Sequence, residues 1–548
     1  MRCHPADRAA DYLQRGWWSA DTIDALLRAR VAEFGDQPAL VDPPNLAELT
    51  GNSPGRWTWT ELAAQVDSLA AYLLSLGVRA GNVVAVQLPN SGDLVRAFLA
   101  IVRIGAIATP FPVSYREHEL VPMCRRTGAV ALITTTRVGD HALAEQASRV
   151  RAEVPSLQHV LTSFADIPDG RAPMHVADVN DCVTICWTSG TEAAPKAVPR
   201  CHADWLVMAL GTQWAARLGP ADVLLSPFPM TNMAGISGMF LPWLMVGGVF
   251  VPHHPFDLTV FLQQIAENRA TYTVAPPALL TMLLHREDLM STVDVSSLRL
   301  VGSGSAPLTP WMVRSWAERY GIEVINFFGS NEGIALVSDP HDVPDPDHRA
   351  TYFPYYASKV RWNNPVAART AVKLADPTTG AAVTVAGQPG ELLIAGPSVF
   401  AGYLNAKPGT ELDRSCFDAD GWFRTGDVFE IAGESDEFLR YVDRAKDLVI
   451  RGGMNISPAE VEGLIAAHPA VTEVAVVGVP DPVLGERVCA VVVLSAELSL
   501  ASLTNFLREQ RVASYKLPER LEIVDALPRN PVGKVLKREL RGLAEVAT

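Results

Sequence analysis

Residues 82–110 read NVVAVQLPNSGDLVRAFLAIVRIGAIATP and combine an apolar run, a helical period and a second apolar segment. The run over 82–89 is short and rich in valine, which predicts a buried strand. The apolar positions of 91–110 first recur at helical spacing and then become continuous. This stretch therefore predicts a strand, a helix and another strand, which is the repeating element of α/β proteins.

The same alternation extends over residues 60–330. An amphipathic helix is expected over 58–77, ending at Gly77, because apolar residues recur there at helical spacing. Strands alternating with helices indicate an α/β architecture of stacked, mostly parallel subdomains. The apolar runs that predict the further buried strands lie at 129–136, 222–229, 246–252, 270–277 and 298–307.

The pattern of apolar runs and turn residues changes twice after this region. From about 366 to 440, short strands alternate with turn sequences such as DPTTG and GQPG, which predicts a β-rich subdomain. Later, a helix is expected to begin after Ser457, a favourable N-cap residue with Glu460 three positions further on. We therefore expect an N-terminal domain over 1–445 and a small mobile C-terminal α+β domain over 446–548.

Composition limits the possible partners. The 548 residues are 48% hydrophobic and 19% charged, an ordinary globular mixture. The net charge is −14 and no long basic run is present, which argues against nucleic acid as a partner. The most apolar stretch, 239–252, is too short to span a bilayer, so no membrane association is expected. A polar N-terminal stretch and scattered cysteines indicate a cytoplasmic protein with reduced thiols.

The loop WTSGTEAAPK, residues 187–196, has the composition of a phosphate-binding turn after an apolar run. Its N–H groups and hydroxyls could surround an anion, and its lysine adds a positive charge. Its spacing does not match a Walker-type loop, so spacing alone leaves a phosphate site and a plain surface turn both open. The candidate phosphate ligands are Thr188, Ser189, Gly190, Thr191 and Lys196.

Four other loops offer groups that suit a nucleotide. The segment NFFGSNEG, residues 326–333, supplies an aromatic ring and then Glu332, which could stack a purine and hold Mg²⁺ near its phosphates. Asp427 in WFRTGD could accept from two ribose hydroxyls, Arg444 lies beside the domain junction, and Lys534 follows a loop rich in proline and glycine. Each of these residues, taken alone, could also be a solvated acid, a helix cap or a surface ion-pair partner.

Taken together, these loops resemble those of the adenylate-forming superfamily, which contains acyl- and aryl-CoA synthetases, carrier-protein adenylation domains and luciferases. The resemblance covers about residues 20 to 540, and its most specific parts are RTGD, DRAKDLVIRGGMNISPAEVE and NPVGKVLK. It identifies WTSGTEAAPK as the phosphate loop of that family. Glu192 and Ala193 depart from the family pattern, which has threonine and glycine there. A carboxylate in this loop would repel ATP unless it points outward or meets Mg²⁺.

The resemblance implies a two-step reaction. A carboxylic acid attacks the α-phosphate of ATP, pyrophosphate leaves, and a pantetheine thiol of CoA or of an acyl carrier protein captures the acyl-adenylate. Glu332 would bind Mg²⁺, Phe328 would stack on adenine, and Asp427 and Arg444 would hold the ribose. Lys534 would bridge the substrate carboxylate and the α-phosphate. Further nucleotide contacts are implied for Ser303, Gly304, Ser305, Ala306, Pro307, Asn326, Gly329, Ser330 and Asn331.

Lys446 stands where the family has its hinge. The C-terminal domain would rotate about this residue between the two half-reactions. The rotation would carry Lys534 away from the nucleotide and bring the loop 451–455 toward a pantetheine tunnel. Lys446 is therefore expected to matter for thioester formation rather than for adenylation.

The segment SPFPMTNMAGISG, residues 226–238, resembles the lining of the acid pocket. It has no aspartate beside Phe228, so an α-amino acid is not expected, and Asn232 replaces the histidine gate of many CoA ligases. The phrase PKAVPRCHADW resembles the branch that activates aryl acids such as hydroxybenzoates, which favours a benzoate-like or cinnamate-like acid. The expected neighbours of the acid are Met230, Asn232, Met233, Gly235, Ser303 and Ile334.

Several alternatives remain open at this point. The first is a CoA ligase, and the second is a stand-alone enzyme that loads an aryl acid onto a carrier protein. The third adenylates another oxyacid, such as nitrite, for transfer to an aryl amine. A non-catalytic nucleotide-binding protein is disfavoured because Glu332, Asp427, Arg444 and Lys534 are all present. We expect a monomer or a homodimer.

Overall fold

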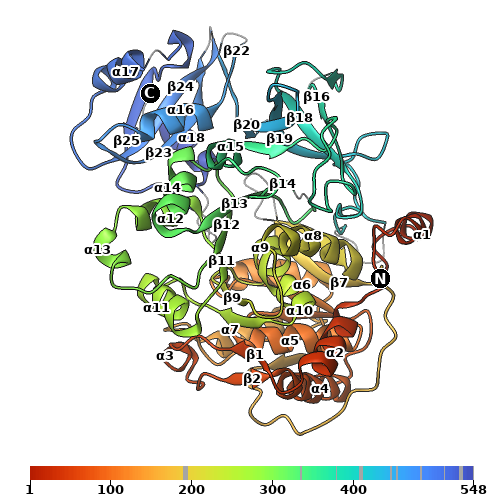
Figure 1. Cartoon of the computed structure of the whole chain (residues 1–548). Coiled ribbons are helices and arrows are strands. Elements are labelled where there is room, and N and C mark those ends of the chain that lie inside the picture. The colour runs from red at the N-terminus through yellow and green to blue at the C-terminus, as the bar shows by residue number, and fades with distance from the viewer. Residues whose placement is uncertain are drawn as a thin grey trace. The chain divides into compact units, whose positions relative to one another are not determined.

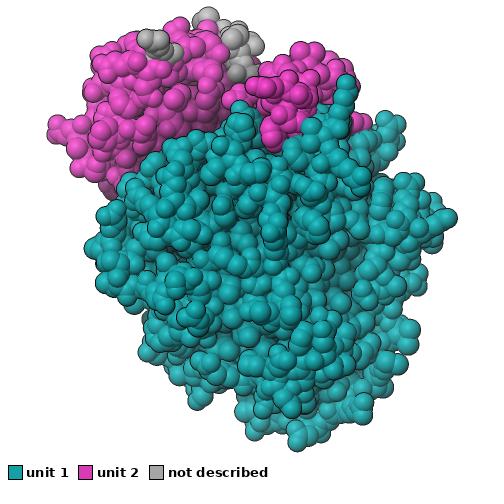
Figure 2. Space-filling view, in the orientation of Figure 1, with its two compact units in different colours: residues 1–188, 196–371, 394–423 teal, residues 189–195, 372–393, 424–548 magenta. Residues whose placement is uncertain are grey.

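A computed structural model of the chain separates into two compact units. Unit 1 comprises residues 1–188, 196–371 and 394–423, and the other described segments from 372 onward belong to unit 2 (Figure 2). None of the helices in the described ranges combines the length and the apolar character that spanning a bilayer requires. The described residues are 1–188, 195–333, 336–377, 379–405, 411–444, 447–451, 454–481, 484–510, 512–529 and 535–546.

Unit 1 contains an eight-stranded sheet that is parallel except at its two edges. The edge pairs β14–β13 and β1–β2 are antiparallel. The strands follow in the order β14 (Leu336–Ser338), β13 (Glu323–Phe328), β12 (Leu300–Gly304), β11 (Tyr272–Val274), β9 (Val223–Ser226), β10 (Val249–Pro252), β1 (Pro38–Val41) and β2 (Arg56–Thr58) (Figure 1).

A six-stranded sheet forms the second layer of unit 1, and only its edge pair β7–β8 is antiparallel. Its strands follow in the order β6 (His159–Leu161), β5 (Ala131–Ile133), β3 (Val83–Val86), β4 (Ile107–Pro110), β7 (Cys182–Thr188) and β8 (Lys196–Cys201). The stretch 82–110 supplies the neighbouring parallel strands β3 and β4 and the helix between them. The predicted α/β fold is therefore confirmed.

One continuous apolar core joins the two sheets, because it contains residues of both sheets and of the helices between them. Trp59 and Trp243 stack within it at 4.8 Å. These helices are α2 (Ile23–Phe34), α4 (Trp59–Ser75), α5 (Gly92–Arg103), α8 (His202–Ala215), the π-helix η1 (Ile236–Phe240) and α10 (Leu241–Val246).

Other helices cover the outer faces of the two sheets. Those on the six-stranded sheet are α6 (Glu117–Thr127) and α7 (Leu143–Glu153), and those on the eight-stranded sheet include α11 (Leu258–Asn268), α12 (Pro277–Leu284) and α14 (Pro310–Tyr320). The shorter elements of unit 1 are α1 (Ala6–Gln14), α3 (Leu46–Thr50), α9 (Met233–Gly235), α13 (Glu287–Met290), α15 (Pro346–Thr351) and β15 (Tyr352–Pro354).

Unit 2 contains the predicted β-rich region and a small α+β body. The β-rich region is formed by β20 (Phe438–Arg444), β19 (Phe423–Ala432), β18 (Gly390–Ala395), β16 (Ala371–Ala375) and β17 (Ala382–Val383). The α+β body has the strand order β22 (Met454–Ile456), β21 (Val449–Arg451), β24 (Gly485–Leu494), β23 (Val471–Asp481), with β25 (Arg520–Ile523) paired to β24. Its helices are α16 (Pro458–Ala466), α17 (Leu500–Glu509) and α18 (Lys537–Val546), with a 3₁₀ turn η2 (Ser514–Lys516).

Candidate active site

Two of the expected nucleotide segments leave the eight-stranded sheet at the same edge. The strands β12 and β13 are parallel, with Ser303 opposite Asn326 and Gly304 opposite Phe327. A Cβ atom at Gly304 would lie 2.3 Å from the carbonyl O of Phe327, so only glycine permits this close approach. The loops that follow these strands therefore begin side by side at their carboxyl ends, where α/β proteins bind ligands.

Some of the residues predicted for nucleotide binding also hold this edge together. Ser303 Oγ donates to the carbonyl O of Ala275 at 2.8 Å, and Asn326 Nδ2 donates to the carbonyl O of Ala350 at 3.0 Å. The ring of Phe328 is half-buried and meets the ring of Phe353 edge-on at 6.0 Å. The remaining predicted positions of these two loops are exposed or half-buried, namely Ser305, Ala306, Pro307, Gly329 and Ser330.

Glu332 and Lys196 converge on one tyrosine. The hydroxyl of Tyr403 donates to Glu332 Oε1 at 2.8 Å, and Lys196 Nζ lies 4.6 Å from the centre of the same ring. Glu332 is 8% exposed. A cation at this distance from an aromatic ring is attracted to the face of the ring. The carboxylate of Glu332 therefore contacts the hydroxyl of Tyr403, and the ammonium of Lys196 contacts the ring of the same residue.

The surroundings keep Tyr403 protonated. Burial raises the pKa of its hydroxyl strongly, and the charge of Glu332 together with the hydrogen bond to it raises the pKa further. Burial also raises the pKa of the neighbouring Cys416 thiol to about 12, although Lys196 opposes this effect. Tyr403 is therefore a permanent donor to Glu332, and Cys416 is a neutral thiol at ordinary pH.

Asn331 ties this group to two other predicted segments. Its Oδ1 accepts from the backbone N of Met233 at 2.8 Å, and its Nδ2 donates to the carbonyl O of Trp187 at 3.3 Å. Trp187 precedes Thr188, whose Cα atom is paired with that of Lys196 across β7 and β8. The residues at the start and end of the predicted phosphate loop, the Glu332 segment and the expected acid pocket are thus neighbours.

The segment predicted to line the acid pocket has internal roles as well. Asn232 Oδ1 accepts from the backbone N of Ala234 at 3.0 Å and so caps the short helix α9. A Cβ atom at Gly235 would lie 2.1 Å from the carbonyl O of Pro229. Met230 is fully buried in the core between the sheets. The assignment of these residues to substrate binding stays a prediction.

In unit 2, Asp427 and Arg444 form one charged pair. They lie opposite each other on β19 and β20, and Arg444 Nε is 3.0 Å from Asp427 Oδ1. Asp427 is only 3% exposed, and its backbone N donates to Thr425 Oγ1 at 3.1 Å. The pair is therefore a fixed carboxylate with a cation beside it, a combination suited to ribose hydroxyls and phosphate.

Several predicted residues lie outside the described residues. They are Ser189, Gly190, Thr191, Ile334, Lys446 and Lys534. Sequence reasoning in turn missed Tyr403, which lies in the apolar stretch VFAGYLN and is 71 positions from Glu332. No local spacing connects two residues that far apart, so the sequence alone carried no signal for this contact.

Known proteins are similar to this chain over most of its length. The family pattern described as AMP-binding enzyme matches residues 27–404, and the pattern described as AMP-binding enzyme C-terminal domain matches 460–534. Triostin synthetase I of Streptomyces triostinicus is 31% identical over 98% of each chain. The 2,3-dihydroxybenzoate-AMP ligase of Bacillus subtilis (strain 168) is 29% identical over 98% of this chain and 96% of its own. The crystal structure of the anthranilate CoA ligase AuaEII with anthranoyl-AMP superposes with a TM-score of 0.82 at 25% identity, covering 96% of this chain and 98% of that one.

Proposed function

This chain belongs to the AMP-binding enzyme family, and from that premise we propose that it adenylates an aryl acid with ATP and transfers the acyl group to the pantetheine thiol of CoA. The observation that supports this best is the meeting of Glu332 and Lys196 at Tyr403. A triphosphate with its metal ion needs one carboxylate and one or more cations at close quarters. Glu332 follows the end of β13, which with its neighbour β12 carries the expected adenine-binding loops.

Glu332 suits the part of a magnesium ligand. Mg²⁺ prefers hard oxygen donors and is commonly held by one or two carboxylates together with substrate phosphates. When bound, it would offset the negative charge that develops on the phosphates. Lys196, with Ser189, Gly190 and Thr191, would hold the β- and γ-phosphates of ATP. Phe328 would cover one face of adenine, opposite the 302–307 segment.

The remaining roles fall to unit 2. Asp427 would accept from the ribose hydroxyls, and Arg444, already paired with it, would add a cation for the nucleotide. Lys534 would bring an ammonium to the α-phosphate and the substrate carboxylate, where negative charge concentrates in the transition state. Lys446 would be the hinge of a C-terminal domain that begins at 446.

An aryl acid is supported by the relatives and by what the pocket segment lacks. The names of two similar proteins specify 2,3-dihydroxybenzoate and anthranilate. The segment 226–238 contains no acidic side chain that could pair with the ammonium of an α-amino acid. Met230, Asn232, Met233, Gly235 and Ile334 would then surround an uncharged ring. Loading of a carrier protein is the second candidate, since one similar protein is named for the aryl-adenylate and not for CoA.

A pyrophosphate-release screen tests the proposal. Benzoates, hydroxybenzoates, anthranilate, cinnamates, alkyl acids and nitrite would each be supplied with ATP and Mg²⁺. We expect the highest kcat/KM with an aryl acid, and consumption of thiol when CoA is added. A phosphopantetheinylated carrier protein in place of CoA distinguishes the second candidate. Preference for an alkyl acid, or nitrite-dependent release followed by reaction with an aryl amine, would contradict the proposed substrate class.

A single variant at Glu332 distinguishes Mg²⁺-dependent adenylation from hydrolysis of ATP by a contaminating enzyme. Glu332→Gln keeps the size and one oxygen of the side chain but removes the charge that would attract Mg²⁺. We expect its acid-dependent exchange of ATP with pyrophosphate to fall by about 10²-fold or more, as is usual when one electrostatic group at a reacting phosphate is lost. Exchange at the wild-type level would exclude Glu332 as the metal ligand.

A further inference from the structure

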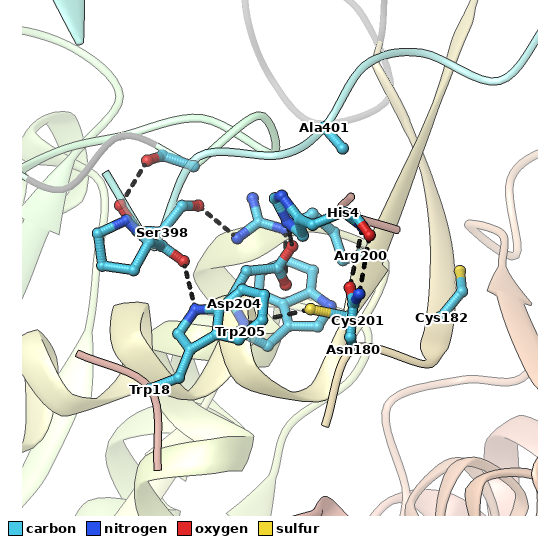
Figure 3. A network of polar contacts seen from close by, with 12 residues as sticks. His4, Trp18, Asn180, Cys182, Arg200, Cys201, Asp204, Trp205, Ser398 and Ala401 are labelled. Carbon is cyan, nitrogen blue, oxygen red and sulfur yellow. Dashed lines mark hydrogen bonds and ion pairs between the residues drawn. The ribbon is translucent and has the colours of Figure 1, made fainter. Parts of the chain in front are cut away.

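Arg200 is a fully buried cation on β8 that bridges two segments remote in sequence. Its Nη1 donates to the carbonyl O of Asn331 at 2.6 Å. Its Nη2 donates to the carbonyl O of Ser398 at 2.7 Å (Figure 3). A guanidinium stays charged when buried, so both bonds are charge-assisted and strong. Arg200 therefore holds the residue before Glu332 against the segment that leads to Tyr403.

The same two segments are joined directly on the other side of Glu332. The backbone N of Phe400 donates to the carbonyl O of Glu332 at 2.9 Å, and Ser398 Oγ donates to the carbonyl O of Gly333 at 3.0 Å. Gly333 has a φ of +106°, and a Cβ atom there would lie 1.9 Å from the carbonyl O of Ser398 and 2.8 Å from Arg200 Nη1. The backbone of Glu332 is thus fixed before and after its own residue.

The charge of Arg200 is balanced by residues that reach back to the N-terminus. Arg200 Nε is 3.1 Å from Asp204 Oδ1, and both side chains have no exposed surface. Asp204 Oδ2 lies 3.4 Å from Nε2 of the buried His4. The backbone N of His4 donates to Asn180 Oδ1 at 2.9 Å, and Asn180 Nδ2 donates to the carbonyl O of His4 at 2.8 Å. These contacts connect the first residues of the chain to Arg200 through buried groups (Figure 3). Arg200 in turn donates to the carbonyl O of the residue before Glu332.

The protonation of His4 fits this arrangement. Burial by itself lowers the pKa of His4, but the hydrogen bonds to Asp204 and Cys201 and the charges of these two groups outweigh it and raise the pKa above its ordinary value. His4 Nε2 and Arg200 Nε both face the carboxylate of Asp204 and depend on its single negative charge. Removing one partner of a buried ion pair strongly destabilises the protein, because the charge of the other partner is left buried without compensation.

The same cluster could be considered as a metal site. His4, Cys201 and Asp204 each place one ligand atom within 4.8 Å of the others. Imidazole, thiolate and carboxylate are ligands that transition metals accept. However, the two oxygens of Asp204 already face Arg200 and His4, and a metal ion would stand beside a guanidinium. Arg200 and His4 already occupy both oxygens of Asp204, so this cluster needs no metal ion to balance the carboxylate.

We infer that His4, Asp204 and Arg200 form a buried relay that positions Glu332 for its metal ion, an inference that rests on the proposed function. His4 and Asp204 are positioning residues that act through Arg200. Loss of the His4 donor would let Asp204 shift, and Arg200 would then hold the carbonyls of Asn331 and Ser398 less firmly. The Glu332 carboxylate would then be less well oriented, and its affinity for the metal ion would fall.

The test is a titration of free Mg²⁺ with the full chain, followed once as heat of binding in the presence of ATP without acid and once as exchange of ATP with pyrophosphate. His4→Leu keeps an apolar volume but removes the donor, and His4→Gln supplies an amide N–H that can reach Asp204. Val66→Ala, in the core on α4, is the control for general destabilisation. We expect the half-saturating Mg²⁺ concentration to rise about tenfold in His4→Leu, the lower end for outer-shell partners of a metal ligand. It should return close to the wild-type value in His4→Gln and stay unchanged in Val66→Ala.

A lower amplitude with an unchanged Mg²⁺ requirement in His4→Leu would overturn the relay, because a loss of folded protein changes the amount of active enzyme and not its affinity. If His4→Leu does not fold, His4→Asn, whose amide is too short to reach Asp204, takes its place with the same expected rise. Stoichiometric bound zinc in the wild type that is lost in His4→Gln would assign the cluster to a metal and equally overturn the relay. A wild type without Mg²⁺-dependent exchange for any acid would instead contradict the proposed function.

Discussion

Tyr403 donates a hydrogen bond of 2.8 Å to Glu332 across 71 positions of sequence, and its ring lies 4.6 Å from Lys196 Nζ. The hydroxyl and the ring face of one residue thus fix a carboxylate and an ammonium relative to each other. Because burial and the charge of Glu332 raise the pKa of Tyr403, the hydroxyl remains a donor over the whole working range of pH. Tyr403 therefore orients Glu332 without competing with it for a cation.

Tyr403→Phe should weaken the response to Mg²⁺. The substitution keeps the ring beside Lys196 but removes the donor to Glu332, so that the carboxylate is free to turn. We expect the half-saturating Mg²⁺ concentration for pyrophosphate exchange to rise about 10- to 100-fold, as found for outer-shell partners of metal ligands. Tyr320→Phe, whose ring packs on Trp316 at 5.1 Å, is the matched control. Equal Mg²⁺ requirements in the two variants would show that the hydrogen bond does not orient Glu332.

His202 should make the protein sensitive to acid. Burial lowers the pKa of His202 to about 4, with partial opposition from nearby aspartates, and its Nδ1 accepts from the backbone N of Ile23 at 3.1 Å. Above the ordinary pKa of about 6.5, the ring is neutral in both the folded and the unfolded chain. As the pH falls from 6.5 toward 4, only the unfolded chain takes up the proton. The stability contributed by the neutral ring is therefore lost over that window.

The size of this effect follows from the shift in pKa. Between pH 7 and pH 5, protonation of the unfolded chain at His202 should remove about 2 kcal/mol of stability. His202→Asn keeps an acceptor near the backbone N of Ile23 and cannot titrate, although its smaller volume lowers stability at all pH values. We expect its midpoint of urea-induced unfolding to change less between pH 7 and pH 5 than that of the wild type. The same change in both proteins would rule out this role of His202.

The parts of the fold that the sequence predicted are those set by local chemistry. The helix α4 begins where Thr58 accepts from the backbone N of Glu61 and the Glu61 side chain accepts from the backbone N of Thr58, a reciprocal cap visible in the sequence as Thr-x-x-Glu. The strands β3 and β4 fall inside the apolar runs of 82–110 because both are fully buried. Ser457 caps α16 through the backbone N of Glu460 at 3.2 Å.

The parts that the sequence could not predict depend on contacts between remote segments. His4 and Asp204 are ordinary polar residues in the sequence, and only the fold buries them beside Arg200. Asn232 was interpreted through its position in the family pattern, whereas the structure also uses its Oδ1 to cap α9. Nothing in the spacing of these residues distinguishes a helix cap from a contact to substrate, because both need the same amide.

Lys446→Pro and Lys534→Ala together test whether one lysine is needed for motion and the other for chemistry. Proline fixes φ near −65°, so it should hinder a rotation about residue 446 while leaving the nucleotide contacts in place. Pyrophosphate exchange should therefore persist in Lys446→Pro, and thioester formation with CoA should fall. Lys534→Ala removes the ammonium expected at the α-phosphate, and its exchange should drop by about 10²- to 10³-fold, as for other single electrostatic donors. If Lys446→Pro lowered pyrophosphate exchange and thioester formation equally, the hinge assignment would fail. If Lys534→Ala kept its pyrophosphate exchange, the ammonium of Lys534 would have no part in adenylation.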